Sequence, residues 1–301
     1  GLFTAGNYSG SGGILVSAGE RTVRIPVTVQ GKEFTGSAWE LSLREADETV
    51  HGQITPVTGT EMEWMALTVD RKETPVELAA DRRSFTCALP DDSFHKLTLK
   101  VGKGSDYAAL TTLEVGEPSA LGNAFSDMNG HWAAKAANYL YRQNIVSGVP
   151  QGAALQYLPQ KAMTRAEFAV LLTGFCGLEP SQANCGLADE SSLPQWAAPS
   201  IRAAVQAGIM SGRAEGSSRV FDPNAPVTRA EACSVLSRTL TGGYPKAQLN
   251  AKDANQIPAW ATDAFRQMVA LGVISGYDDG MLRPNNSVTR AEAAQMLYRL
   301  Y

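Results

Sequence analysis

The second half of the chain repeats itself every 61 to 64 residues, and this repeat constrains the fold more than any other feature. Trp-Ala pairs start at positions 64 residues apart: Trp132, Trp196 and Trp260. Thr-Arg-Ala-Glu motifs start at positions 64 and 61 residues apart: Thr164, Thr228 and Thr289. An Asp precedes each Trp, and a Ser-Gly pair follows it by 15 residues in all three copies. This recurrence indicates three units of one supersecondary type.

Each unit is predicted to be helix–loop–helix. The first helix begins near the Trp, where Pro194 and Pro258 are well placed to start it in the second and third units. Apolar residues then follow with helical spacing, and Gly208 and Gly272 lie near the expected helix end. The last unit is three residues shorter between Ser-Gly and Thr-Arg-Ala-Glu, which places the deletion in a loop.

The second helix begins at Thr-Arg-Ala-Glu. Thr at the N-cap and Glu at N3 make a reciprocal capping box, and each unit has an apolar residue before the Thr that could act as a hydrophobic staple (Met163, Val227, Val288). The Arg between them has no structural role that the sequence reveals, and at N1 it opposes the helix dipole. It is either a solvated or salt-bridged residue or an anion-binding one (Arg165, Arg229, Arg290).

The order Asp, Trp-Ala, Ser-Gly, Thr-Arg-Ala-Glu resembles the S-layer homology (SLH) domain, in three consecutive copies over roughly residues 122–301. The resemblance implies a pseudo-threefold helical assembly. Its inter-repeat grooves would bind secondary cell-wall polymers, often pyruvylated, in Gram-positive bacteria. It places the three Arg residues against the acidic substituent, the three Trp residues at or beside the grooves, and the Asp residues on sugar hydroxyls or in loop bracing (Asp127, Asp189, Asp253).

Each of these residues also has a purely structural interpretation. A Trp that opens an amphipathic helix is more often core than sugar platform, and this is the interpretation we favour for the three Trp. The Asp residues could simply cap helices or brace loops. The Ser of each Ser-Gly pair could contact ligand, but turn chemistry alone explains it (Ser147, Ser211, Ser275). Binding by one or two grooves is as compatible with the sequence as binding by all three.

The first half of the chain has the alternation of β-strands. We expect seven strands, at 21–29, 39–43, 51–57, 63–69, 84–89, 95–101 and 108–115, with a hairpin loop at 102–106. This spacing favours an immunoglobulin-like β-sandwich. Residues 1–19 are rich in Gly and Ser, so they form a flexible lead-in or contribute a further strand.

The predicted fold class is therefore α+β and multidomain. An N-terminal all-β sandwich (20–117) follows the lead-in and precedes an all-α triple repeat. The units are unit 1 (122–182), unit 2 (183–246) and unit 3 (247–301). Formal charge differs between the halves: 11 Lys+Arg against 17 Asp+Glu give −6 for 1–117, and 15 against 13 give +2 for 118–301. The repeat half is thus the better candidate for an anionic partner.

Several other function classes find no support in the sequence. The sequence contains no run of 18 apolar residues, the length needed to cross a membrane. Its formal net charge of −4 does not favour binding to nucleic acid. There is no His-Glu-x-x-His, Cys-x-x-Cys or Gly-x-Ser-x-Gly motif, and no P-loop or dinucleotide fingerprint. We expect no enzymatic activity, no cofactor and no metal. Cys176 and Cys185 bracket a short loop and could equally form a disulfide or remain free.

These observations predict an extracellular protein of the cell wall or surface layer that is anchored non-covalently through an anionic wall polysaccharide. In the alternative, the repeats no longer bind glycan, and the protein acts as a surface-layer or adhesin element. Its β domain would then assemble with itself or with other surface proteins.

Overall fold

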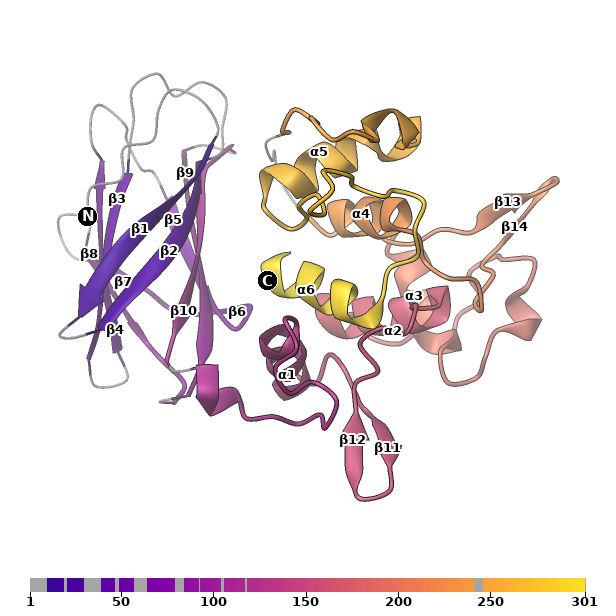
Figure 1. The fold of residues 1–301 in the computed structure, drawn as a ribbon, viewed down its shortest axis with the longest axis horizontal. Helices are drawn as coiled ribbons and strands as arrows, with labels where there is room; N and C mark the ends of the chain where they lie inside the picture. Colours follow the sequence, from indigo (N-terminus) through magenta and orange to yellow (C-terminus); the bar gives the residue numbers. More distant parts are fainter. Residues whose placement is uncertain are drawn as a thin grey trace.

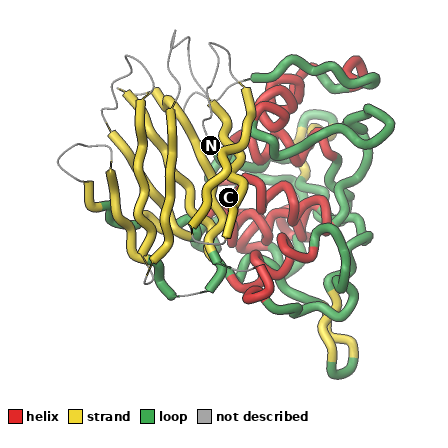
Figure 2. Tube along the Cα trace, turned by 60° about the vertical axis from the view of Figure 1, so that its left-hand side comes forward, coloured by secondary structure: helices red, strands yellow, loops and turns green. Residues whose placement is uncertain are grey.

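The computed structural model describes residues 10–18, 21–29, 39–46, 49–56, 64–78, 84–91, 93–103, 106–116, 118–240 and 246–300. Strands form one side of the molecule and helices the other (Figures 1 and 2). None of the helices in these ranges is long and apolar enough to cross a membrane.

The β half contains two antiparallel sheets. The six-stranded sheet has the order β1 (Gly10–Ala18), β2 (Arg21–Val29), β10 (Asp106–Val115), β9 (His95–Lys103), β5 (Trp64–Val69) and β6 (Lys72–Glu73). The four-stranded sheet has the order β3 (Trp39–Ala46), β4 (Thr49–Pro56), β8 (Ser84–Ala88) and β7 (Glu77–Leu78). The long β9–β10 pair places Glu114 opposite Lys96, near the helical half.

All seven expected strands are present, as β2, β3, β4, β5, β8, β9 and β10. Val57, Glu63 and the tip of the expected 102–106 loop lie outside the described residues. Residues 10–18 form the further strand that was one of the two alternatives for the N-terminal segment, and this strand is β1. Residues 1–9 and 19 lie outside the described residues. The two-residue strands β6 and β7 were not expected, because segments this short carry no alternation. An immunoglobulin-like arrangement stays a prediction.

Each repeat is helix–loop–helix, as expected. The first helices are α1 (Ala134–Arg142), α3 (Ala198–Gln206) and α5 (Thr262–Ala270), and the second helices are α2 (Arg165–Cys176), α4 (Arg229–Arg238) and α6 (Arg290–Leu300). Short 3₁₀ turns precede or join them: η1 (Pro118–Leu121), η2 (Glu190–Ser192), η3 (Ala254–Gln256) and η4 (Ala259–Ala261). The first helices of units 2 and 3 are followed by Gly208 and Gly272 in the left-handed conformation (φ 70° and 67°), which ends them.

The prediction of an all-α repeat region was wrong. A hairpin of β11 (Val149–Gln151) and β12 (Ala154–Gln156) projects from unit 1, and β13 (Arg213–Glu215) with β14 (Ser218–Val220) projects from unit 2 (Figure 1). Unit 3 closes the same loop with a turn in which Tyr277 N–H donates to the Met281 carbonyl (2.9 Å). The three-residue deletion falls in this loop and leaves too little chain for a hairpin.

The three units meet at a closed ring of backbone hydrogen bonds. Met163 N–H donates to the Val288 carbonyl (2.9 Å), Val288 to Val227 (2.8 Å), and Val227 to Met163 (2.9 Å). These residues, expected as staples, are buried at 4%, 0% and 1% exposure. Because each unit donates to one neighbour and accepts from the other, none of the three completes its backbone pairing alone.

The expected capping boxes are present in all three units. Glu N–H donates to the N-cap Thr Oγ1 at 3.2 Å in each, and the Thr N–H donates back to the Glu carboxylate at 2.9–3.0 Å. Each cap contributes about 1 kcal/mol. Each N-cap Thr is the next residue in the chain after a residue of the central ring. The caps therefore fix the points at which α2, α4 and α6 begin at the centre of the molecule.

Candidate functional site

The Asp that precedes each Trp braces the loop of its own unit. Each carboxylate accepts two consecutive backbone N–H groups at 2.7–2.9 Å: Asp127 from Tyr157 and Leu158, Asp189 from Phe221 and Asp222, Asp253 from Leu282 and Arg283. The second residue of each pair has positive φ, at 59°, 57° and 51° respectively. This conformation strains side-chain-bearing residues, so the Asp holds a backbone shape that would otherwise relax. Loop bracing is confirmed, and a contact with sugar hydroxyls stays a prediction.

The repeated Arg residues join consecutive units. Each Nε donates to a loop carbonyl of the next unit, and each Nη2 to the Ser carbonyl of that unit's Ser-Gly pair. The pairs and Nε distances are Arg165 to Phe221 (2.6 Å), Arg229 to Leu282 (3.0 Å) and Arg290 to Tyr157 (2.7 Å). The Arg residues therefore have a structural role, and the ion pairs of Arg165 with Glu231 (3.2 Å) and of Arg229 with Glu292 (3.7 Å) match the salt-bridged alternative. Their partners lie in another unit, where sequence spacing does not reveal them.

Burial makes two of these Arg residues part of the fold. Arg165 and Arg229 are 3% and 5% exposed, and desolvation lowers the pKa of Arg165. Each of the three guanidinium groups also lies over an aromatic ring at 4.8–5.0 Å: Arg165 over Phe221, Arg229 over Tyr277, Arg290 over Tyr157. Truncating Arg165 or Arg229 would leave buried carbonyls unpaired, so such variants test stability as much as binding.

The three Ser residues contribute their backbone to this arrangement. Each accepts a guanidinium N–H through its carbonyl, at 2.8–3.4 Å, while the residue as a whole is exposed. The Ser-Gly turn therefore positions a carbonyl for the neighbouring unit's Arg. Use of the hydroxyl by a ligand stays a prediction.

The Trp residues are on the surface, which corrects the expectation that they belong to the core. Trp132, Trp196 and Trp260 are 59%, 61% and 62% exposed. The following Ala in each Trp-Ala pair is fully buried instead. The small side chain lets the start of the first helix approach the core closely, and the preceding ring is left outside it. Three equivalent exposed Trp rings are unusual for a surface, where aromatic residues generally mark binding sites.

A cavity of about 300 Å³ lies between units 2 and 3, which we name groove 2–3. Its lining includes Arg229 of unit 2, Trp132 of unit 1, and residues 273–277 with Glu292, Gln295, Met296 and Arg299 of unit 3. Arg299 is exposed, and its pKa is lowered first by partial burial and then by the positive charge of Arg229. Two guanidinium groups thus face one cavity. Glu292 also lines this cavity and lies 3.7 Å from Arg229, so it offsets part of this positive charge, and a bound anion would offset the rest.

Tyr277 forms an aromatic wall of groove 2–3. Its hydroxyl donates to the Glu292 carboxylate, and its ring lies between the guanidinium groups of Arg229 (5.0 Å) and Arg283 (4.2 Å). Burial and the bond to Glu292 raise the pKa of Tyr277 to about 12, so the hydroxyl stays protonated at neutral pH. The groove therefore combines an anchored aromatic ring, an exposed Trp and two cations.

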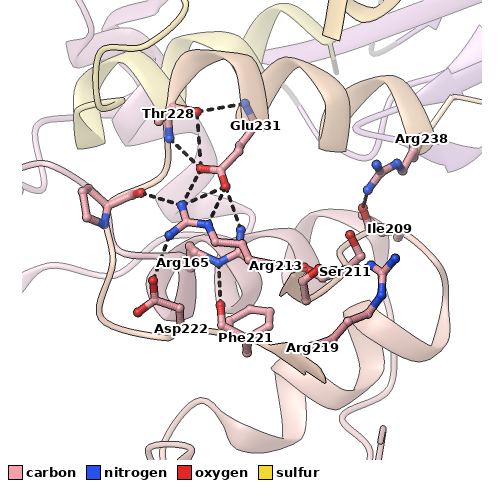
Figure 3. Close-up of polar contacts among 12 residues, drawn as sticks. Arg165, Ile209, Ser211, Arg213, Arg219, Phe221, Asp222, Thr228, Glu231 and Arg238 are labelled. Carbon is pink, nitrogen blue, oxygen red and sulfur yellow. Dashed lines mark hydrogen bonds and ion pairs between the residues drawn. The ribbon is translucent and has the colours of Figure 1, made fainter. Parts of the chain in front are cut away.

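The equivalent position between units 1 and 2, groove 1–2, is occupied by Arg213 (Figure 3). Arg213 takes the place of Tyr277, two residues after the Ser of the Ser-Gly pair. Its guanidinium donates to Glu231 (2.8 Å) and to Asp222 (2.9 Å), while Arg165 also contacts Glu231 (3.2 Å). Here Arg165 and Arg213 both pair with Glu231, whereas in groove 2–3 the equivalent Glu292 lies 3.7 Å from Arg229.

Groove 3–1, where Arg290 meets unit 1, is less polar at the matching positions. Val149 stands where groove 2–3 has Tyr277, and Gly174 stands where it has Arg299. Arg290 bonds to the Tyr157 and Ser147 carbonyls as its counterparts do. The loops that contain Tyr277 and Arg213 differ visibly between units in the sequence, but neither these two residues nor Arg299 was predicted to belong to the site. Superposing the three units by their motifs would have found them, because these are the positions at which the units differ.

The four cysteines lie apart from one another in the fold. Cys176 and Cys185 are free thiols, as are Cys87 and Cys233, so the unpaired alternative holds in this structure. Among the described residues, no group of three His, Cys, Asp or Glu side chains is arranged to hold a metal ion.

The S-layer homology domain model matches residues 124–169, 188–233 and 252–294. The chain carries three consecutive S-layer homology domains. Each matched segment runs from just before the bracing Asp into the second helix, so it contains the Asp, the Trp, the Ser-Gly turn and the capping box. The SLH match therefore covers the shared motifs of the grooves, while Gln295, Met296 and Arg299 of groove 2–3 lie beyond it.

Relatives are similar to a large share of the chain. It is 30% identical to the exoglucanase XynX of Acetivibrio thermocellus over 196 residues, which are 62% of this chain and 17% of that protein. It is also 30% identical to an S-layer protein of Bacillus thuringiensis subsp. finitimus and to the S-layer protein sap of Bacillus anthracis. Each of these two matches spans 204 residues, 66% of this chain and 24% of the relative. The chain thus spans a quarter or less of their length. The SLH domains and these relatives indicate a location at the bacterial cell wall or surface layer and support anchoring there.

Proposed function

We propose that the SLH domains anchor this chain non-covalently to an anionic secondary cell-wall polysaccharide, and that groove 2–3 is the principal binding site. The observation that carries the proposal is the convergence of Arg229 and Arg299 on one cavity that Trp132 and Tyr277 also line. Guanidinium groups suit carboxylates, including the carboxylate of a pyruvyl substituent. Aromatic faces suit the apolar faces of sugar rings.

Groove 1–2 contributes less in this proposal, because Arg213 pairs with Glu231 and Asp222 and a ligand would have to displace it. Groove 3–1 offers Arg290 without a second cation at the Arg299 position. Weak additional grooves still matter on a wall that presents many copies of its polymer, because engagement of a second groove on one body lengthens residence.

The test is co-sedimentation of the full chain with purified Gram-positive sacculi, before and after chemical removal of the secondary polysaccharide. Arg299→Gln is the informative variant, since Arg299 is exposed and its hydrogen bond within the described residues is a 3.5 Å contact with the Gly272 carbonyl. Loss of one charge-assisted contact should weaken binding about tenfold or more. Lys246→Gln removes an exposed cation that lies outside the cavity lining, and it serves as the matched control.

Binding that disappears with the polysaccharide and weakens in Arg299→Gln supports the proposal. Binding that persists on bare peptidoglycan contradicts the choice of ligand. Equal binding by Arg299→Gln and wild type contradicts the choice of groove.

A further inference from the structure

The β domain contacts α6, which lines groove 2–3, and α1, which begins two residues after the lining residue Trp132. Glu114, near the end of β10, accepts from Lys135 Nζ on α1 (2.7 Å) and from the Tyr298 hydroxyl on α6 (2.6 Å). One carboxylate of the β domain therefore ties unit 1 to unit 3. Figure 1 shows α1 and α6 beside the strands of the six-stranded sheet.

Residues of the cavity wall lie just before one tied helix and on the other. Trp132 lies three residues before Lys135, and Arg299 directly follows Tyr298. Trp132 and Arg299 come from opposite ends of the repeat region, so the packing of α1 against α6 sets how they face each other. Glu114 acts on that packing from outside the groove, since the cavity lining does not include it.

The surroundings of Glu114 are well packed. Lys96 donates to the Tyr298 carbonyl and lies over the Tyr298 ring at 3.8 Å. The Tyr298 and Tyr139 rings meet edge to face at 5.4 Å, and Tyr139 donates to Asp70 of the β domain (2.6 Å). Lys96, Tyr139 and Tyr298 are 3%, 0% and 4% exposed. Hydrogen-bonded polar groups with this little solvent exposure are held in one arrangement.

Glu114 is charged under ordinary conditions. Burial alone would raise its pKa, but hydrogen bonds from Lys135 and Tyr298 and the nearby positive charges outweigh burial and lower the pKa. The carboxylate therefore accepts from both helices at neutral pH.

We infer that the β domain is a working part of the glycan-binding unit, with Glu114 as the positioning residue that holds Trp132 and Arg299 at the geometry of groove 2–3. This inference rests on the proposed function for the identity of the ligand. The positioning of Trp132 by Glu114 does not depend on that identity.

The experiment uses the full chain labelled with 5-fluorotryptophan, with the Trp132, Trp196 and Trp260 signals assigned by single Trp→Phe variants. Glu114→Gln should move the Trp132 fluorine resonance and leave those of Trp196 and Trp260 in place. Lys135→Met removes the same tie from the α1 side and should reproduce the shift. Asp263→Asn breaks an exposed ion pair of comparable length (Asp263 with Lys246, 2.7 Å) and serves as the control.

Sacculus binding supplies the second readout. Glu114→Gln should weaken binding about threefold to tenfold, the effect of one or two neutralised contacts. If Glu114 acts through groove 2–3, the same change should have a smaller effect in an Arg299→Gln background. A general loss of stability would weaken binding equally in both backgrounds.

The outcomes separate the two proposals. A selective Trp132 shift with no wall binding by the wild type would retain the positioning role and reject the proposed function. An unmoved Trp132 resonance in both Glu114→Gln and Lys135→Met would overturn the positioning role. Equal movement of all three Trp resonances would overturn it too, since Glu114 would then support the whole fold.

Discussion

Groove 1–2 and groove 2–3 are built from the same backbone elements and differ in the side chains that occupy them. Both have the bracing Asp, the Ser-Gly turn and an Arg at the start of a capped helix. Two residues after the Ser, one has Arg213 paired with Glu231 and Asp222, and the other has Tyr277 beside a cavity of about 300 Å³. The comparison shows that the repeated motif builds the scaffold, while the positions that vary between units determine what each groove offers a ligand.

The largest effect is expected from removing the brace of groove 2–3. Asp253→Ala deprives the Leu282 and Arg283 N–H groups of their acceptor, and Asp253 is 1% exposed. Unfolding free energy should fall by about 3 kcal/mol. Asp189 is the equivalent residue of unit 2 and is less buried. Asp189→Ala should therefore lower the unfolding free energy by a smaller amount, because water can reach the freed N–H groups. Urea denaturation of both variants measures the difference, and equal losses would contradict the role of burial.

The occupant of groove 1–2 can be removed directly. Arg213 is about one-third exposed, so Arg213→Ala should cost less than about 1 kcal/mol of stability. The substitution removes the ion pairs of Arg213 with Glu231 and Asp222. It also leaves groove 1–2 open at the position that Tyr277 occupies in groove 2–3. Calorimetric titration with soluble wall polysaccharide should show a change in stoichiometry or in the affinity of a second site. An isotherm identical to that of the wild type would mean that Arg213 does not obstruct this groove.

A smaller, pH-dependent effect concerns the support of α6. Burial lowers the pKa of Lys96 from 10.5 to about 7, so the folded state disfavours the charged form. Between pH 7 and 10.5 the unfolded chain binds more protons at this group, and Lys96's contribution to stability therefore rises with pH. The unfolding free energy of the wild type relative to Lys96→Met should rise by at most about 1.4 kcal/mol per pH unit in that range.

Urea denaturation of the wild type and Lys96→Met at pH 7, 8 and 9 tests this prediction. Below pH 7 the difference in unfolding free energy between the two proteins should no longer change with pH. His95 acts in the opposite direction: its hydrogen bond to Asp70 raises its pKa, so its stabilising contribution is lost as pH rises. Because His95 is present in both proteins, its contribution largely cancels in the difference. A difference that does not vary with pH would show that Lys96 is not held at a lowered pKa.

Much of the fold was predictable because the physics involved is local. Strand alternation identified seven strands, and the capping boxes at Thr164, Thr228 and Thr289 located the start of three helices within a residue. The deletion in unit 3 was correctly placed in a loop. Each of these inferences depends on residues a few positions apart in the chain, and neighbouring residues interact in the same way in almost any context.

The tertiary structure decided the roles of the site residues. Each repeated Arg bonds to the Ser carbonyl of the next unit, 46, 46 and 143 positions away, so its structural role could not be read from its own motif. The Trp rings lie outside because the adjacent Ala packs inward, and Glu114 meets Tyr298 across 184 positions. The sequence by itself determined the repeat, its helices and its caps. Only the closing of three units into a ring, with the β domain against two of their helices, determined which side chains are buried, which are paired and which remain available to a ligand.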